Sequence, residues 1–93
     1  MEPSRNLPTA REMIPHLVSA LAAFNREASV REIEETIAKR LQLTPEELSI
    51  PHDRSRTEFQ YRLAWSRSYA KKDGLLVSNR RNHWMLPQSL PGA

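Results

Sequence analysis

The sequence predicts a mainly helical α+β domain in which three helices precede a C-terminal β-hairpin. Apolar residues recur at helical spacing over residues 9–24, 29–41 and 57–73. Two short apolar runs, residues 75–78 and 83–86, flank a polar loop, which is the pattern of a hairpin. A helix-turn-helix followed by a two-stranded wing is the winged helix-turn-helix arrangement.

The first helical stretch has one apolar face, which consists of Ile14, Leu17, Val18, Leu21 and Phe24. Pro15 lies inside this stretch. A proline costs least in the first helical turn, because its missing N–H would have no partner there. We therefore expect a short turn from Thr9, followed by a helix that begins near Pro15.

The second helix has a clear start, because Ser29 and Glu32 form a capping box. Its apolar stripe consists of Val30, Ile33, Ile37 and Leu41. Thr44 and Pro45 then open a short helical turn that reaches Leu48, and residues 50–53 break the chain.

The third helix is expected over residues 57–73, with Gly74 at the left-handed position that follows many helices. Its inward stripe consists of Phe59, Leu63, Ser66 and Ala70. The opposite face is polar and of small to medium size, and is suited to lying in a groove; it consists of Tyr61, Ala64, Ser68 and Lys72.

The hairpin decides which side chains near the C-terminus reach the core. If Ser78 pairs with His83, four side chains turn toward the core, namely Leu75, Val77, Trp84 and Leu86. The loop lacks glycine, but Asn79 and Asn82 adopt positive φ at modest cost. We also expect a brief strand at residues 27–29 to pair with the hairpin.

The chain has 93 residues, which is enough for one modest core. We expect a flexible N-terminus (residues 1–6), one folded domain (residues 7–87) and a linker-like tail (residues 88–93). The absence of cysteine excludes disulfides and cysteine-ligated zinc. No apolar run approaches the ~20 residues of a membrane span, and no signal peptide is visible. A cytoplasmic protein without membrane contact is therefore expected.

Charge is distributed unevenly along the chain. Residues 1–53 carry six basic and nine acidic side chains, a net charge of −3. Residues 54–81 carry eight basic and two acidic side chains, a net charge of +6. This asymmetry is typical of a protein that presents one surface to a polyanion, although a basic, solvated helix face gives the same count.

Several sequence segments together resemble the N-terminal domain of Mrr-type restriction endonucleases over residues 7–87. These segments are Leu7-Pro8-Thr9, Ile14-Pro15-His16-Leu17, Arg62-Leu63-Ala64-Trp65, Lys71-Lys72-Asp73-Gly74-Leu75-Leu76, and Trp84. Tyr61 departs from the family, which usually has a polar residue there, and Asn82-His83 replaces a common glycine before the tryptophan. The resemblance implies a module that reads DNA, followed by a nuclease domain that cuts modified DNA.

The chain offers no sign of catalytic chemistry. The nuclease fold of that family needs an Asp and an Asp/Glu-x-Lys motif to hold a metal, and this chain has no Pro-Asp and no Asp/Glu-x-Lys. His16, His52 and His83 lie far apart without metal-ligand spacing. The acidic group Glu32, Glu34 and Glu35 is most simply a solvated helix face, with Glu32 capping. We therefore predict a domain that is not an enzyme and binds no metal or other cofactor.

The predicted partner is double-stranded DNA, and the predicted contacts come from the basic half of the chain. We expect phosphate contacts from Arg54, Arg56, Arg67, Lys71, Arg80 and Arg81, with Asn82 beside them in the wing. Residues at the start of a recognition helix reach base edges, which points to Ser55, Arg56, Thr57, Gln60 and Tyr61. Ser55 and Thr57 are also helix-cap candidates, and capping alone explains them equally well.

Three other side chains have two interpretations each. Trp65 and Trp84 have flat aromatic rings on which bases can stack, but their spacing favours positions in or at the edge of the core. Arg62 lies at the boundary of the inward face, where it either braces the wing or second helix through a carboxylate or contacts a phosphate. Two other functions also stay open for the whole domain: a winged helix that binds proteins or dimerises, and a freestanding transcriptional regulator.

Overall fold

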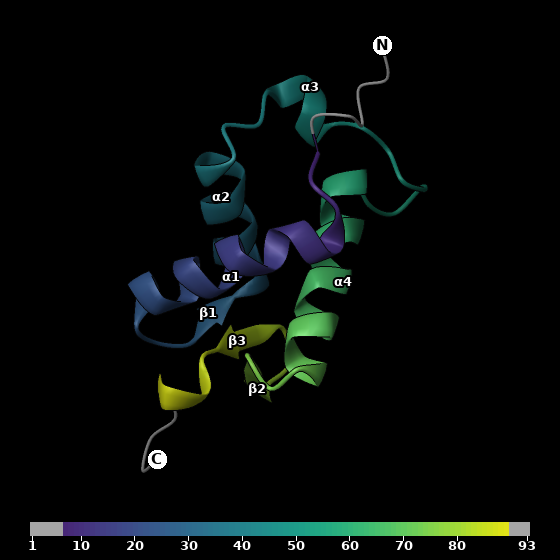
Figure 1. Cartoon of the computed structure of the whole chain (residues 1–93). Coiled ribbons are helices and arrows are strands. Elements are labelled where there is room, and N and C mark those ends of the chain that lie inside the picture. The colour runs from purple at the N-terminus through teal and green to yellow at the C-terminus, as the bar shows by residue number, and fades with distance from the viewer. Residues whose placement is uncertain (1–6, 90–93) are drawn as a thin grey trace.

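The computed structural model describes residues 7–89 and confirms the winged helix-turn-helix fold (Figure 1). The helices are α1 (Ala10–Phe24), α2 (Val30–Arg40), the short α3 (Pro45–Leu48) and α4 (Glu58–Lys72). The strands are β1 (Ala28–Ser29), β2 (Val77–Arg80) and β3 (His83–Met85), and a 3₁₀ turn follows at Pro87–Ser89. None of the helices over residues 7–89 is long and apolar enough to cross a membrane.

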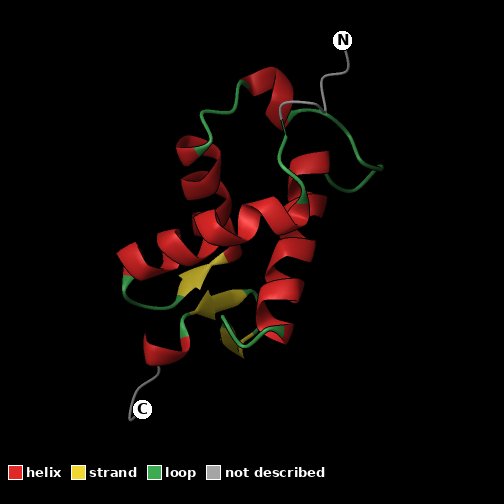
Figure 2. Ribbon diagram, in the orientation of Figure 1, coloured by secondary structure: helices red, strands yellow, loops and turns green. Residues whose placement is uncertain are grey.

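Helix α1 packs against α2 and α4, and the small sheet lies at one end of the three helices (Figure 2). Their shared core is formed by side chains that are at most 5% exposed, including Met13, Leu17, Leu21, Ile33, Ile37, Leu63 and Leu76. The inward stripe predicted for α4 is buried in full, whereas of the α2 stripe Ile33 and Ile37 are buried, Leu41 packs partly buried against the core and Val30 is only partly buried. The two regular helices of the helix-turn-helix are therefore positioned by the residues that the sequence pattern indicates.

The predicted start of the first helix was wrong. Helix α1 begins at Ala10, and Pro15 lies inside it on the exposed side. Proline supplies no N–H to the carbonyl of Arg11, four residues earlier, and normally costs about 3 kcal/mol in a helix interior. A capping box formed by Thr9 and Glu12 and the burial of the apolar face beyond Pro15 outweigh that cost.

Each of the other helices begins with a capping box. Ser29 caps α2 as predicted, Thr44 caps α3, and Thr57 caps α4 together with the side chain of Gln60. Ser55 is not the cap of α4. Gly74 follows α4 with φ +78°, the left-handed conformation predicted for it.

The hairpin pairs differently from the prediction. Strand β2 continues to Arg80, which pairs with His83, and an irregularity separates this pair from Val77 and Met85. The Ser78 hydroxyl lies 2.7 Å from the His83 carbonyl and 2.9 Å from the Arg80 carbonyl. It is therefore the hydrogen-bond donor for backbone carbonyls at this irregularity. The predicted Ser78–His83 pair was therefore wrong, and the loop is shorter than predicted.

The changed register also changes the predicted core face of the hairpin. Leu76, Met85 and Leu86 are buried, whereas Leu75 is 41% exposed and Val77 and Trp84 are only partly buried. Of the two asparagines, only Asn82 has positive φ (61°), because Asn79 lies within β2. The predicted strand at residues 27–29 does form, as β1, and it pairs with β3 in a sheet of order β1-β3-β2.

The predicted flexible N-terminus (residues 1–6) and residues 90–93 of the predicted tail lie outside the described residues. The tail was expected to begin at residue 88. Gln88 and Ser89 instead belong to the 3₁₀ turn, in which the Ser89 N–H donates to the Leu86 carbonyl at 2.9 Å. The folded part of the chain therefore extends at least to residue 89.

The cap of α2 predicts a specific dependence of stability on acid. Arg26 donates to Glu32 at 2.7 Å and the Ser29 N–H donates to it at 3.0 Å, and these two contacts lower the pKa of Glu32 from 4.5 to about 2. A lowered folded-state pKa contributes stability above pH 4.5 that is lost as the pH falls toward 2. Glu32→Gln keeps the capping geometry but cannot titrate. Urea unfolding should therefore show a smaller loss of stability for this variant than for the wild type between these pH values, and parallel losses would contradict the assignment.

Candidate nucleic-acid interface

The outward face of α4 is the first part of the candidate interface. Ala64 and Ser68 are small, so another molecule can approach the helix backbone closely between larger neighbours. Together with Arg56 and Trp65 they line a shallow hollow of about 220 Å³. Trp65 is 45% exposed, so its predicted place in or at the edge of the core was wrong. The reason is geometric, because Leu63 takes the inward direction and a residue two positions later points about 200° away.

A second and larger hollow lies where three elements meet. It measures about 650 Å³ and is lined by residues of the start of α2, the start of α4 and the turn between β2 and β3, namely Ser29, Val30, Arg31, Glu34, Gln60, Asn82 and His83. We call this surface the concave face. The Val30 N–H donates to the Asn82 carbonyl at 2.9 Å, which ties the wing (residues 77–85) to α2. The two helices of a helix-turn-helix and its wing thus face one space.

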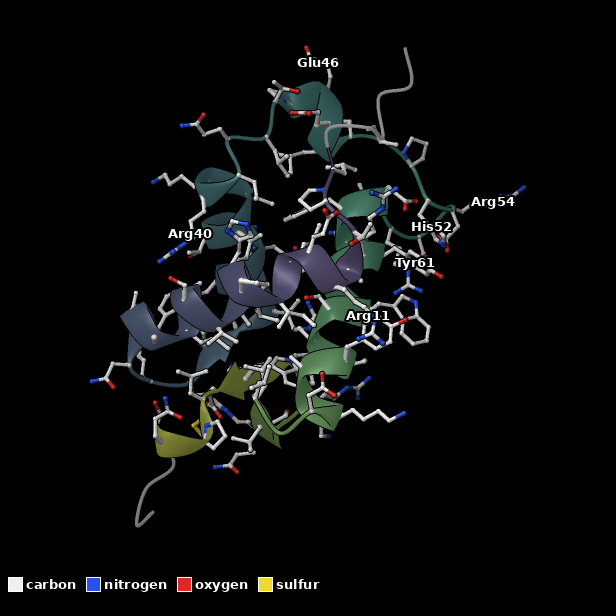
Figure 3. All side chains as sticks on the ribbon, in the orientation of Figure 1. Arg11, Arg40, Glu46, His52, Arg54 and Tyr61 are labelled. Carbon is white, nitrogen blue, oxygen red and sulfur yellow. The ribbon has the colours of Figure 1, made fainter. Side chains whose placement is uncertain are left out.

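The loop ahead of α4 is held by its own hydrogen bonds. Asp53 accepts from the N–H and hydroxyl of Ser55, each at 2.8 Å, and from the N–H of Arg56 at 3.1 Å. These bonds lower the pKa of Asp53, the bond from the Ser55 N–H most of all. Ser55 and Thr57 are therefore occupied in shaping this loop and the cap. Arg54 is exposed and projects away from the rest of the molecule at the loop tip (Figure 3).

Tyr61 is covered by neighbours rather than open to a base. Its ring stacks on His52 at 3.6 Å between centroids, and the Arg56 guanidinium lies 5.0 Å from its centroid (Figure 3). Glu58 accepts from Arg62 at 2.7 Å and lies 3.0 Å from His52 Nδ1. These two contacts, that of Arg62 first, lower the pKa of Glu58. The group therefore forms a braced unit at the start of α4.

Arg62 braces a part of the chain that the sequence did not indicate. Its Nη1 donates to the carbonyl of Leu7 at 2.8 Å and lies 3.3 Å from that of Pro8, while its Nε donates to Glu58. The predicted bracing of the wing or α2 was wrong, because within residues 7–89 the bonds of Arg62 go to Leu7, Pro8 and Glu58, and contact with a phosphate stays a prediction. It fastens the segment before α1 to α4.

Arg67 and Lys71 reach toward the wing. The Arg67 guanidinium lies 5.9 Å and the Lys71 ammonium 5.8 Å from the Trp84 ring centroid. Trp84 packs partly buried against the core, as predicted. Lys71 is exposed, whereas Nε and Nη1 of Arg67 are buried and make no hydrogen bond with the described residues. Burial lowers the pKa of Arg67, and the charge of Glu34 acts in the opposite direction.

The two wing arginines have different surroundings. Arg80 is paired, because its Nε donates to Glu27 at 2.8 Å. Arg81 is exposed at the turn, and within residues 7–89 its side chain has no ion pair. Its carbonyl lies 2.8 Å from His83 Nδ1, which stiffens the turn. Both arginines are therefore exposed, Arg80 with 66% of its side chain, but within residues 7–89 only Arg80 has an acidic partner.

Sequence reasoning missed the contribution of α2. Arg31, Glu34 and His83 line the concave face but were not among the predicted contacts. Gln60 was predicted and lies on this face, although its Oε1 already accepts from the Thr57 N–H at 3.0 Å. Helical spacing indicates the outward side of α2, but only the packing of α2 against the wing shows which part of that side meets α4.

Comparison with known families gives one match. The family model described as the Mrr N-terminal domain matches residues 11–89, which include α1 except for its first residue, the helix-turn-helix and the wing. No curated protein and no solved structure matches the chain. The match agrees with the resemblance carried by the motifs around Arg62 and Lys71. The chain therefore belongs to the Mrr N-terminal domain family.

Proposed function

We propose that this domain binds double-stranded DNA as the target-recognition module of a Mrr-type restriction endonuclease. The observation that carries the proposal is the concave face, where the starts of α2 and α4 and the wing turn line a single hollow. In helix-turn-helix proteins the first helix crosses the phosphate backbone while the second enters the major groove. Net charge supports the same assignment, since residues 54–81 carry +6.

Phosphate contacts are assigned to the exposed cations around this face, Arg31, Lys71 and Arg81. Arg67 is excluded from this group because its guanidinium is largely buried. The amide nitrogen of Gln60 makes no hydrogen bond within residues 7–89 and is assigned to donate to a base edge. The outward face of α4, with Ala64 and Ser68 at its centre, allows close approach to the groove floor.

Discrimination of modified cytosine is the finer part of the proposal. A C5 substituent projects into the major groove, where a recognition helix meets it without opening the duplex. The hollow lined by Arg56, Ala64, Trp65 and Ser68 offers an apolar wall and a cation to such a group. Tyr61 is not assigned this role, because its ring is already stacked on His52.

Binding to duplex DNA is expected to weaken steeply as salt rises. Neutralising about three phosphates, one for each assigned cation, gives a log–log slope of about −3, with a Kd of about 1 μM at ~50 mM salt. Fluorescence anisotropy with a labelled duplex, repeated over a salt series, measures both quantities. No binding to any duplex at low salt would refute the proposal.

The proposal assigns no catalysis to this domain. Within residues 7–89 no three His, Asp or Glu side chains lie close enough to hold a metal ion. The DNA recovered from the same titration, run with Mg²⁺ present, should therefore be uncut. A protein-binding or dimerising winged helix remains the rival function, and it predicts a concentration-dependent protein complex without salt-sensitive DNA binding.

A further inference from the structure

One acidic side chain lies among the residues that line the concave face. Glu34, on α2, is partly buried and lines the concave face beside Gln60, Asn82 and His83. It also lines a different hollow, of about 220 Å³, which lies between α2 and α4 and is separate from the concave face. Its carboxylate therefore lies at the α2–α4 boundary, on the surface assigned to DNA.

The neighbouring carboxylates on α2 have partners, whereas Glu34 has none among the described residues. Glu32 pairs with Arg26 at 2.7 Å, and Glu35 lies 3.7 Å from Arg31. Within residues 7–89, Glu34 makes no ion pair and no hydrogen bond through its side chain. Helix capping and surface pairing, which explain Glu32 and Glu35, therefore do not explain Glu34.

Arg67 faces the same boundary from α4, and it too has unused hydrogen-bonding capacity. Its buried Nε and Nη1 have no partner within the described chain, yet it is close enough to Glu34 for their charges to interact. Buried donors of a charged group are costly to leave unpaired. Within residues 7–89 the two side chains nevertheless form no ion pair.

A free carboxylate has one disadvantage and one use on a DNA-binding surface. It repels phosphates, and this lowers affinity for every duplex. It accepts hydrogen bonds and donates none, so in the major groove it suits an amino group, and cytosine N4 suits it better than adenine N6, which lies beside the N7 acceptor. A phosphate and a guanine edge, which offer only acceptors there, are both rejected.

We propose that Glu34 is a specificity-determining residue that accepts a hydrogen bond from the N4 amino group of cytosine in the major groove. This inference rests on the proposed function, since it requires duplex DNA on the concave face. It goes beyond that function by assigning base selection to α2 as well as to α4.

The test is affinity selection from a duplex library with randomised positions, carried out with the wild type and with Glu34→Gln. The wild type should enrich cytosine at one position, and the variant should lose that enrichment by about 5- to 100-fold, which corresponds to about 1–3 kcal/mol for one base contact. Because the variant also loses a negative charge, its affinity for unselected duplexes should rise. Glu46→Gln on α3 is the matched control, with the same charge change at an exposed site far from the wing (Figure 3).

The outcomes separate the inference from the proposed function. If the wild type binds duplex DNA but shows no base preference, or if Glu34→Gln keeps the same preference, the role of Glu34 is refuted and DNA binding stands. If the wild type binds no duplex, the proposed function fails and the inference fails with it. Loss of thermal stability in Glu34→Gln with unchanged base ranking would show that Glu34 serves only to neutralise Arg67.

Discussion

Leu63→Ala is expected to lower the free energy of unfolding by about 3 kcal/mol, within the range of about 2–5 kcal/mol for buried leucines. Leu63 is fully buried on the inward face of α4, in the core that also contains Leu17 and Ile37. Small domains have only about 5–15 kcal/mol of stability, so this is a large fraction of the total. The melting temperature should fall by about 12–24 °C, measured by circular dichroism.

Leu75→Ala is the matched control for this experiment. The substitution is chemically the same, but Leu75 is 41% exposed, and exposed sites usually change stability by less than about 0.5 kcal/mol. The pair of variants also tests the register of the hairpin, because the register expected from the sequence places Leu75 in the core. Equal losses of stability at positions 63 and 75 would contradict the observed packing of the wing.

Helix starts and inward stripes were predictable because their signals are local. The capping boxes at Ser29 and Thr57 involve residues three positions apart, and the spacing of Phe59, Leu63 and Ala70 defines one face without reference to the rest of the chain. The position of Pro15 could not be predicted in the same way. Its cost is local, but it is outweighed by the tertiary packing of α1 against α2 and α4.

The register of the wing depends on contacts distant in sequence. The Val30 N–H donates to the Asn82 carbonyl, and Glu27 pairs with Arg80, so the start of α2 and the residue before β1 hold the turn from outside the hairpin. In a short strand, alternation of apolar and polar residues does not decide which set of side chains faces the core. A shift of the register by one residue moves each side chain to the opposite face. This is why the sequence placed Leu75 in the core when Leu76 is the buried residue.

The sequence predicted where the candidate site lies, but not which side chains line it. The basic stretch and the helix order indicated α4 and the wing; Gln60 and Asn82 line the concave face, and Arg81 adjoins Asn82 in the wing turn. Which arginines are free could not be derived from the sequence. Arg62 and Arg80 are committed to other chain segments, and nothing in their local sequence marks those partners.

Arg81→Glu compared with Arg40→Glu tests most directly the claim that the concave face binds duplex DNA. Both substitutions change the net charge by the same amount at exposed arginines. Arg81, however, lies on the wing turn, whereas Arg40 lies in the last turn of α2, away from the Ser29 end, where it bonds to Ser19 (Figure 3). Neither side chain is part of the core, so thermal stability should stay nearly unchanged in both variants.

The expected result is that Arg81→Glu weakens binding to all duplexes by about tenfold or more and reduces the salt slope by about 1, as the loss of a phosphate contact requires. Arg40→Glu should keep the wild-type slope and stay within about threefold of wild-type affinity, because its charge is largely screened beyond a Debye length of ~10 Å. The measurement is a fluorescence anisotropy titration of each variant over one salt series. Equal losses of affinity in the two variants would contradict the account, because they would show that net charge, and not the concave face, determines binding.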